Sequence, residues 1–287
     1  MTEASQRQPV RAVRGPSSAP GWLALDRGYP AVMGILNVTP DSFSDGGRFL
    51  DPRNALARAE RMIADGADII DVGAESTRPY GGQLPVSADE EISRLRPLLK
   101  DLVALGTPVS IDTMKPMVAR FALDAGASIV NDVWGLQREA EMARIVADYA
   151  VAVVAMHNRE TVDPAIDIMR DIADFFAHTL EIADKAGIAR EKIALDPGIG
   201  FGKDARQSMT SLARLAELRA FGRPLLVGAS RKRFISSVIA CEPHQRLGGS
   251  LAAHLQAARN GAAIIRAHDV AETVQALRVN AAIEGQR

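Results

Sequence analysis

The sequence predicts an α/β protein, a TIM (β/α)8 barrel of one domain that follows a flexible N-terminal tail. The first observation is an alternation that recurs from Tyr29 onward: a short run rich in Val, Ile and Leu, a polar loop, a longer segment with helical spacing of its apolar residues, and then Gly or Pro. This alternation is typical of βα units whose parallel strands are buried on both faces. The second observation is that the runs number eight, the number of strands that closes such a barrel.

Each of the eight apolar runs has the length of one strand and is bounded by polar or turn-forming residues. A doubly wound open sheet is the alternative, but it would usually carry a Gly-rich dinucleotide-binding turn after its first strand, and Gly34 alone is not that fingerprint. The predicted strands are Ala31–Leu36, Ile69–Val72, Val109–Ile111, Ser128–Asn131, Ala152–Val154, Ile193–Leu195, Leu225–Val227 and Ala263–Ile265.

A helix is predicted after each strand, because apolar residues recur there every three or four positions. The first helix follows an Asp51-Pro52 pair, which offers an N-cap and then proline at the first helical position. Gly66, Gly126, Gly187 and Gly261 are typical of left-handed C-caps that lead into the next strand. The predicted helices are Pro52–Ala64, Ala88–Leu105, Pro116–Ala125, Ala140–Asp148, Pro164–Ala186, Gln207–Arg219, Gly248–Asn260 and Asp269–Ala281.

The domain organisation follows from where this pattern begins. No linker or composition shift interrupts residues 29–280, so residues 29–287 are predicted to form the single barrel domain. Residues 1–28 are polar and contain several prolines and arginines, and they lack the apolar core of a secretory signal. An organellar transit peptide is the alternative, but Glu3 and the absence of an evident amphipathic helix favour a flexible tail.

Charge and cysteine content exclude several classes of protein. Lys and Arg number 34 against 35 Asp and Glu, a net charge of −1, whereas a protein that coats nucleic acid needs a basic excess. No apolar run approaches the length of a membrane span. The lone Cys241 excludes an internal disulfide framework and a multi-cysteine metal site, and it favours a reducing compartment, for which we take the cytoplasm.

Polar residues follow all eight predicted strands, at the barrel face that carries active sites. Any single one could be a helix N-cap or a loop hydrogen bond, but eight of eight predict a polar mouth above an apolar barrel. In strand order, they are Asn37; Asp71 with Glu75, Ser76, Thr77 and Arg78; Asp112 and Thr113; Asn131 and Asp132; Met156, His157 and Asn158; Asp196; Ser230, Arg231 and Lys232; and Arg266 with His268.

The chemistry of this set is mixed, with acids and amides on the middle strands and cations on the last two. Asp71, Asp112, Asp132 and Asp196 are the candidate carboxylates. They suit a ligand with adjacent N–H donors, such as an aminopyrimidinone. No HExxH or paired-histidine spacing is present, so any metal is expected to be Mg²⁺ held by one or two oxygens and substrate phosphates. Arg266 and His268 fit a phosphate group.

Lys232 and two loops allow two interpretations each, and a glycine-rich segment allows one to be rejected. Lys232 stands out because six lysines face 28 arginines, and it is either a site cation or a solvated loop cation. The loops 39–47 and 77–85 are either lids that exclude water or ordinary surface loops. Residues 196–203 contain three glycines, but they lack the Walker spacing and so do not form a P-loop.

The motifs together resemble the dihydropteroate synthase family, from about Met33 to Val270 and in the family's order. That family consists of TIM barrels, and the resemblance is carried by residues 33–47 (Met-Gly-Ile-Leu-Asn-Val-Thr-Pro-Asp-Ser-Phe-Ser-Asp-Gly-Gly), Glu75-Ser76-Thr77-Arg78-Pro79, Ile111-Asp112-Thr113, Asn131-Asp132, Asp196-Pro197-Gly198, Ser230-Arg231-Lys232 and Arg266-Ala267-His268.

The resemblance implies a transferase of folate biosynthesis that joins 6-hydroxymethyl-7,8-dihydropterin diphosphate to 4-aminobenzoate and releases diphosphate. It also implies a Mg²⁺ cofactor on Asn37, a sulfonamide target, a homodimer, and neither a nucleic-acid nor a membrane partner. The catalytic residues would be Asp112, Asp196, Lys232, Arg266 and His268. Pterin diphosphate would be bound by Thr77, Asp112, Asn131, Asp196, Lys232, Arg266 and His268, and 4-aminobenzoate by Phe43, Thr77, Pro79, Ser230 and Lys232.

Two segments depart from the family pattern. Residues 80–84 make a longer turn than usual, and Met156-His157-Asn158-Arg159-Glu160 lacks the common continuation after the methionine, which leaves the packing of Met156 on the pterin open. Two other functions remain as alternatives: a corrinoid-linked methyltetrahydrofolate methyltransferase, which shares a pterin-binding barrel, and a non-catalytic paralogue. For the dimer, Leu251–Ala258 could contribute, or the same helix could pack only on its own barrel.

Overall fold

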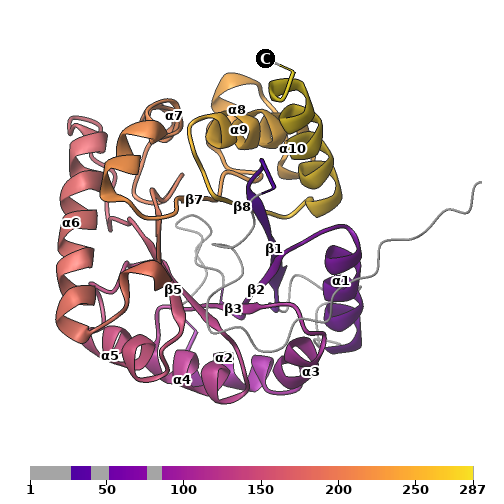
Figure 1. The fold of residues 1–287 in the computed structure, drawn as a ribbon, viewed down its shortest axis with the longest axis vertical. Helices are drawn as coiled ribbons and strands as arrows, with labels where there is room; N and C mark the ends of the chain where they lie inside the picture. The colour runs from indigo at the N-terminus through magenta and orange to yellow at the C-terminus, as the bar shows by residue number, and fades with distance from the viewer. Residues whose placement is uncertain (1–26, 40–51, 76–85, 287) are drawn as a thin grey trace, which may run out of the picture.

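The computed structural model describes residues 27–39, 52–75 and 86–286, and they form a (β/α)8 barrel (Figure 1). Eight parallel strands are hydrogen-bonded in the order β6-β5-β4-β3-β2-β1-β8-β7. An isolated parallel bridge between Leu195 and Leu225 joins the two ends of that order, so the sheet closes on itself. The strands are β1 (Ala31–Asn37), β2 (Ile69–Gly73), β3 (Val109–Asp112), β4 (Ile129–Asp132), β5 (Ala152–Met156), β6 (Ile193–Asp196), β7 (Leu226–Val227) and β8 (Ile264–Ala267).

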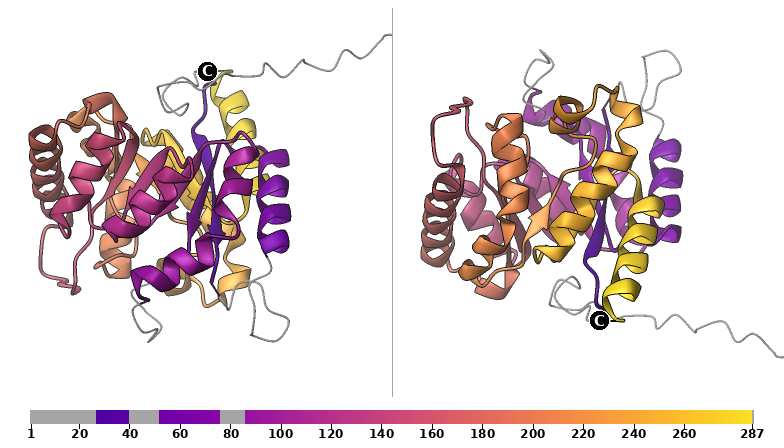
Figure 2. Two further views of the ribbon diagram at one scale, coloured as in Figure 1. Left: turned by 90° about the horizontal axis from the view of Figure 1, so that it is seen from below. Right: turned by 90° about the horizontal axis from the view of Figure 1, so that it is seen from above.

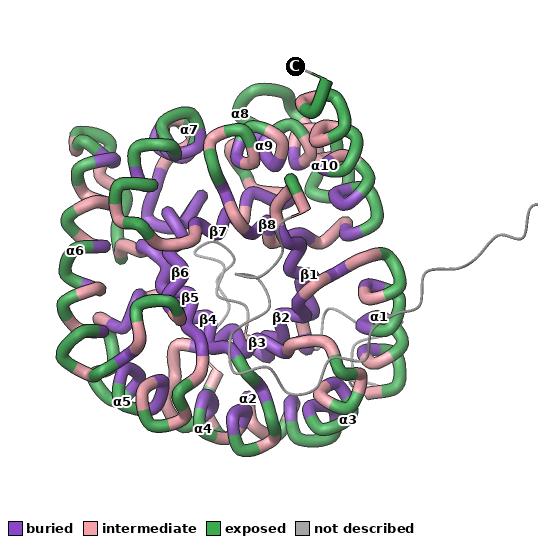
Figure 3. The backbone as a smooth tube through the Cα atoms, viewed as in Figure 1, coloured by how far each residue is buried: buried purple, intermediate pink, exposed green. Residues whose placement is uncertain are grey.

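Helices surround the strands on all sides, as the two side views in Figure 2 show. Their inner faces are buried and their outer faces exposed, while the strands at the centre are buried almost throughout (Figure 3). The helices are α1 (Pro52–Ala64), α2 (Ala88–Leu95), α3 (Leu99–Ala104), α4 (Pro116–Asp124), α5 (Ala140–Asp148), α6 (Ile168–Ala186), α7 (Ala205–Ala213), α8 (Phe234–Val238), α9 (Leu247–Arg259) and α10 (Val270–Glu284), with 3-10 turns at Arg190–Lys192, Leu215–Phe221 and Pro243–Gln245.

The interior of the barrel is a separate apolar cluster. Because side chains alternate across a strand, every second residue points inward, and the inward residues near the amino ends of the strands pack together. The cluster is formed by Ala31, Met33, Ile69, Ile129, Ala152, Val154, Ala194, Leu226 and Ile264. We call this cluster the apolar plug. It fills the barrel near the amino ends of the strands, so a ligand would approach the interior from their carboxyl ends.

The predicted fold is confirmed, and the differences lie mainly at helix ends. The predicted helix 88–105 is two helices, since Pro97 lacks a backbone N–H and disfavours helical geometry in the residue before it. Helix α6 starts at Ile168 rather than Pro164, because the Asp167 side chain accepts hydrogen bonds from the backbone N–H of Met169 and Arg170 at 3.1 and 3.4 Å. The short helix α8 was not predicted.

The predicted glycine C-caps are also confirmed, because Gly66, Gly126, Gly187 and Gly261 all have positive φ angles. Residues 1–26 of the predicted tail lie outside the described residues. Arg27 contacts the barrel: its Nη2 donates to Asp68 Oδ2 at 2.6 Å, an oxygen that also accepts the N–H of Val32. Within the described residues, no helix combines the length and the apolarity that crossing a bilayer requires.

Candidate active site

The predicted polar residues lie at the carboxyl ends of the strands, directly above the apolar plug. The alternation of the strands explains this position: Asp71, Asn131, Asp196 and Arg266 each come two residues after a member of the plug. A single step of two residues thus changes the inward side chain from hydrocarbon to acid, amide or guanidinium. The same alternation places Asn37 on the inner face of β1, and its side chain is half-buried.

Arg266 is the centre of this layer. Its Nε donates to Asp71 Oδ2 at 2.6 Å and its Nη2 to Asp112 Oδ2 at 2.7 Å, while only 18% of its side chain is exposed. The Nδ2 of Asn131 donates to the same Asp71 oxygen at 3.1 Å. The acids and the cations come from different strands, as predicted from the sequence. They are not separated in space, however, because the cation of β8 lies against the acids of β2 and β3.

The two carboxylates paired with Arg266 each have one oxygen that no described residue contacts by a hydrogen bond. Asp71 Oδ1 and Asp112 Oδ1 are both buried and accept no hydrogen bond from residues 27–39, 52–75 and 86–286. Burial raises the pKa of Asp112 to about 7, against the opposing effect of Arg266, and the nearby Asp71 charge raises it further. Buried acceptors that lack a hydrogen-bond donor favour a ligand that brings donors.

Asp196 ends β6 and is 4% exposed. The N–H of Gly198 donates to its Oδ1 at 2.7 Å, which fixes the orientation of the carboxylate. Burial raises the pKa of Asp196 to about 6, although the Gly198 hydrogen bond and the charge of Lys232 act to lower it. Its Oδ2 accepts no hydrogen bond from the described residues, so one carboxylate oxygen is available beside the plug.

An apolar wall stands beside these acids. Val133, Met156 and Phe201 pack together, and the half-buried Met114 and Trp134 lie against them. The ammonium of Lys232 lies 4.0 Å from the centroid of the Phe201 ring, a cation–π contact. Lys232 is therefore not a solvated loop cation, and Met156 lies in the wall despite the unusual residues that follow it.

Ser230 and His268 meet where the loops after β7 and β8 adjoin. The backbone N–H of His268 donates to Ser230 Oγ at 3.2 Å, and His268 Nδ1 lies 3.0 Å from the same oxygen. Arg231 and Asp269, the residues next to this pair, form an ion pair whose Nε–Oδ2 distance is 3.0 Å. His268, predicted to contact phosphate, and Ser230, predicted to contact 4-aminobenzoate, thus lie in two loops that two separate contacts hold together.

Some predicted residues have other roles or fall outside the description. Asp132 points away from the mouth, because it is one residue off the inward register; it accepts the N–H groups of Trp134 and Leu136 at 2.9 and 2.7 Å. Glu75 holds Lys115 at 2.6 Å and accepts the N–H of Val86. The predicted residues Phe43, Thr77 and Pro79 lie outside the described residues.

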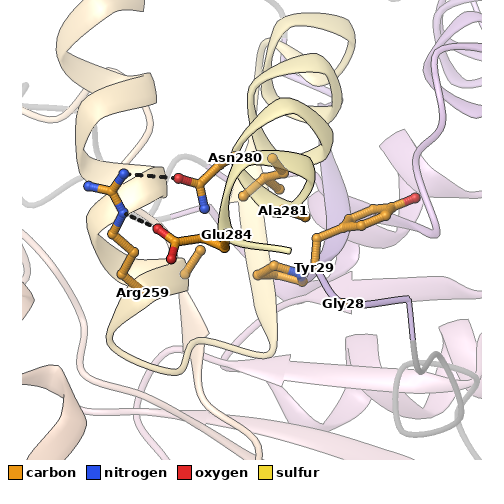
Figure 4. Close-up of a pocket in the computed structure, with 9 residues that line it drawn as sticks. Gly28, Tyr29, Arg259, Asn280, Ala281 and Glu284 are labelled. Atoms are coloured by element: carbon orange, nitrogen blue, oxygen red, sulfur yellow. Dashed lines mark hydrogen bonds and ion pairs between the residues drawn. The ribbon is translucent and has the colours of Figure 1, made fainter. Parts of the chain in front are cut away.

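A cavity of about 530 Å³ lies at the opposite end of the barrel (Figure 4). It opens between the residues before β1 and the ends of α9 and α10. Arg259 crosses it, with Nη2 donating to Asn280 Oδ1 at 3.0 Å and Nε 3.6 Å from Glu284 Oε1. These polar groups satisfy one another and half of the Arg259 side chain is exposed, so we assign the active site to the carboxyl end.

Similarity to known proteins agrees with this geometry. The family model described as pterin binding enzyme matches residues 33–268. The dihydropteroate synthase of Escherichia coli K12 is 44% identical over 263 residues, which cover 89% of this chain and 92% of the relative. The Bacillus subtilis enzyme is 44% identical over 240 residues, or 83% of each chain. This chain belongs to the dihydropteroate synthase family.

Solved structures of this family superpose on the whole barrel. The Clostridium difficile dihydropteroate synthase in the presence of pteroic acid gives a TM-score of 0.86 at 47% identity and covers 90% of this chain and 98% of that one. The Xanthomonas albilineans enzyme with 4-aminobenzoic acid gives 0.85 at 44% identity, with 89% and 93% covered. The family predicted from the sequence motifs is thereby confirmed, as is the TIM-barrel fold.

Within this dihydropteroate synthase fold, two buried residues are more important than the sequence motifs indicate. Asp71, one of the four candidate carboxylates, holds both Asn131 and Arg266; its place two residues beyond Ile69 is the signal that identifies it. Lys203, at the end of the glycine-containing segment 196–203, is 2% exposed and hydrogen-bonded to His157.

Proposed function

We propose that this protein is a dihydropteroate synthase, a transferase of folate biosynthesis that joins 6-hydroxymethyl-7,8-dihydropterin diphosphate to 4-aminobenzoate. The observation that carries the proposal is the convergence of Asp112, Asn131, Asp196, Arg266 and Lys232 on one end of the barrel. Relatives that align over nearly the whole barrel have been solved with pteroic acid, 4-aminobenzoic acid and 7,8-dihydropteroate.

The acids recognise the pterin. An aminopyrimidinone ring presents two parallel N–H donors, and the Asp196 carboxylate accepts them because Gly198 holds it in one orientation. The buried oxygens of Asp71 and Asp112 that accept no hydrogen bond from the described part of the chain provide further acceptors nearby. Val133, Met156 and Phe201 supply an apolar surface for the flat ring.

The cations stabilise the departing diphosphate. Lys232 and His268 come from the loops after β7 and β8, where barrels often bind phosphate. The positive charge of Lys232 and the hydrogen-bond donors of both residues lower the energy of the leaving group as its negative charge grows. Arg266 has a second task, since it neutralises Asp71 and Asp112 and so keeps two acids in the buried site.

The Mg²⁺ cofactor fits this arrangement through Asn37. An amide oxygen at the end of β1 is a hard ligand of the kind Mg²⁺ prefers, and the ion commonly needs only one or two protein oxygens when phosphates complete its shell. The described residues contain no group of three or more acids, histidines or cysteines that would form a protein-only metal site. When bound, Mg²⁺ would neutralise charge on the diphosphate.

The protein's remaining contribution is positioning. The aniline nitrogen of 4-aminobenzoate is largely unprotonated at neutral pH, so the reaction needs no strong base. As the carbon–oxygen bond to diphosphate lengthens, the pterin methylene becomes cationic, and the carboxylates around it stabilise that charge. Substitution at the methylene by the aniline nitrogen forms the new carbon–nitrogen bond, and its proton leaves to solvent or diphosphate.

Diphosphate release from purified protein, pterin diphosphate, Mg²⁺ and 4-aminobenzoate tests the proposal. We expect diphosphate release that depends on 4-aminobenzoate. If no such release is seen, the synthase assignment is wrong, and the methyltransferase or the non-catalytic paralogue takes its place. Asp196→Asn and Lys232→Ala are each expected to lower kcat/KM by about 100-fold or more while thermal unfolding stays cooperative. A sulfonamide, the class bound in the Yersinia pestis enzyme, should compete with 4-aminobenzoate.

We also propose that the enzyme is a cytoplasmic homodimer. Val279 and Ile283 lie one turn apart on α10 and are 55% and 57% exposed, which supports an apolar contact there. On α9, by contrast, Ala253 and Ala257 are buried against the chain's own barrel. Light scattering after gel filtration should give twice the monomer mass, and Val279→Asp with Ile283→Asp should give the monomer.

A further inference from the structure

Lys203 carries a buried charge that the proposed reaction does not use. It follows β6 by seven residues, and its side chain is among the largest that are fully enclosed. Its Nζ lies 2.7 Å from His157 Nδ1, 3.0 Å from the carbonyl oxygen of Gly198 and 3.0 Å from that of Phe201. An ammonium has three N–H donors, and each of them has one acceptor here.

This arrangement defines the state of His157. Since Nδ1 accepts from Lys203, the imidazole is neutral and carries its proton on Nε2, which donates to Asp171 Oδ2 at 2.9 Å. Burial lowers the pKa of His157 to about 4, in agreement with a neutral ring. Lys203, His157 and Asp171 thus form one continuous chain from the interior to the surface of α6.

The two carbonyl groups held by Lys203 belong to residues that touch the active site. The N–H of Gly198 orients the Asp196 carboxylate, and the ring of Phe201 lies beneath Lys232. The loop is also pressed against β5, since a Cβ at Gly198 would lie 2.0 Å from the His157 carbonyl oxygen. Lys203 therefore holds, from below, the loop that presents Asp196 and Phe201.

We propose that Lys203 is a positioning residue for pterin binding, which acts by fixing the Gly198 and Phe201 peptide groups and through them Asp196 and Lys232. This inference rests on the proposed function for the identity of the ligand. It rests on the geometry of Lys203 for the role itself. A side chain with three donors at this point is needed, because an apolar side chain would leave two carbonyls and an imidazole without partners.

Lys203→Met removes the donors while keeping an unbranched side chain. We expect the KM for pterin diphosphate to rise about 10-fold, since misorientation of one buried acceptor corresponds to roughly a factor of ten in affinity. The affinity for pteroic acid, measured by calorimetry, should fall by a similar factor. Lys203→Arg should not restore either value, because a planar guanidinium cannot place three donors at these acceptors.

Lys192→Met is the matched control. Lys192 also donates its Nζ to a backbone carbonyl, that of Ala150, but it precedes β6 at the far end of the barrel. Its removal should leave the KM and the pteroic acid affinity unchanged. Lys203→Met with wild-type KM and wild-type pteroic acid affinity would overturn the proposal.

If Lys203→Met fails to fold, an NMR measurement on the wild-type protein tests the same proposal. With [¹⁵N]lysine and [¹⁵N]histidine labels, the Lys203 ammonium should show a slowly exchanging NMR signal and His157 the neutral Nε2–H form. Pteroic acid should shift the Lys203 signal but not that of Lys192, and an unshifted Lys203 signal contradicts the proposal. Absence of diphosphate release from wild type would contradict the synthase assignment alone, because these signals do not depend on turnover.

Discussion

Arg266, on β8, and Lys203, in the loop after β6, are two buried cations near the same barrel mouth, and they are held in different ways. Arg266 lies between two carboxylates, those of Asp71 and Asp112. Lys203 lies among an imidazole and two backbone carbonyls, all of them neutral. One region is an ion-pair network and the other is a hydrogen-bond network around a single charge.

The difference appears in their proton affinities. Burial acts to lower the pKa of Arg266, but the attraction of Asp71 and Asp112 outweighs it and the pKa is raised. Burial lowers the pKa of Lys203 to about 7, because the more distant acids Asp196 and Asp171 compensate only in part. Direct carboxylate partners thus stabilise a buried charge in the layer that binds ligand, whereas neutral acceptors mainly fix geometry.

The largest effect on stability and activity is expected from removing Arg266, the cation of the ion-pair network. Arg266→Met would leave Asp71 and Asp112 buried without a cation, which costs about 3–5 kcal/mol of unfolding free energy, and synthase activity should fall below detection. Urea unfolding measures the first and diphosphate release the second. Arg259→Met, which breaks the surface contact shown in Figure 4, should cost about 1 kcal/mol or less; equal losses in the two variants would show that Arg266 is no more than a surface cation.

The second-largest effect is expected from Asp71→Asn. Asn can still accept a hydrogen bond, but it has no charge to pair with Arg266, so we expect about 2 kcal/mol of lost stability. We expect kcat/KM to fall about 30-fold, because Arg266 and Asn131 lose the carboxylate that positions them; such a fall corresponds to about 2 kcal/mol of transition-state stabilisation. Asp132→Asn is the control, because Asp132 is equally buried but faces away from the mouth. It should lose stability while kcat/KM stays near that of wild type.

The pH dependence of pterin binding sharpens the role of Asp196. Since burial raises its pKa to about 6, the carboxylate becomes protonated as pH falls through 6, and it then loses its capacity to accept two donors. The KM for pterin diphosphate should therefore rise about 10-fold for each pH unit below 6. Steady-state kinetics between pH 5 and 8 measure this. Asp112, whose pKa is raised to about 7, titrates in the same range in both proteins, so the rise in KM below pH 6 should be smaller in Asp196→Asn than in wild type, and equal profiles would argue against the assignment.

The smallest effect concerns His157, the partner of Lys203, and the fall in unfolding free energy at acid pH. The folded state lowers the pKa of His157 to about 4 from 6.5, so between these values the unfolded chain binds more protons and stability falls as pH falls. The loss attributable to His157 is about 0.8 kcal/mol at pH 6. Urea unfolding at pH 7.5 and 6 should show a smaller loss for His157→Gln. His178→Gln, on the exposed face of α6, should keep the wild-type loss.

The barrel and much of its mouth could be predicted because both follow from periodicity. Strands alternate, so the residue beyond each apolar run identifies Asn37, Asp112 and Asp196 directly. Asp71 was harder to identify, because it lies in the middle of β2 and a rule based on strand ends gives it little weight. Its inward register is visible only when the plug is known.

Pairing across the barrel could not be predicted from local pattern. Asp71 and Arg266 are separated by 195 positions in the chain, and no short motif reports which acid an arginine will meet. The same holds for Lys203 and His157, which are 46 positions apart. The break between α2 and α3, by contrast, was readable at Pro97 and the predicted continuous helix was wrong.

The close contact between Gly198 and His157 has a consequence for building chimaeras. A Cβ at Gly202 would lie 2.4 Å from that of Arg159, so the β6 loop touches the β5 loop at two glycines. Neither glycine can be replaced by a residue with a side chain unless the β5 loop shifts. Recombination between family members should therefore place its crossover points before β5 and after α7, so that the two loops are inherited as one block.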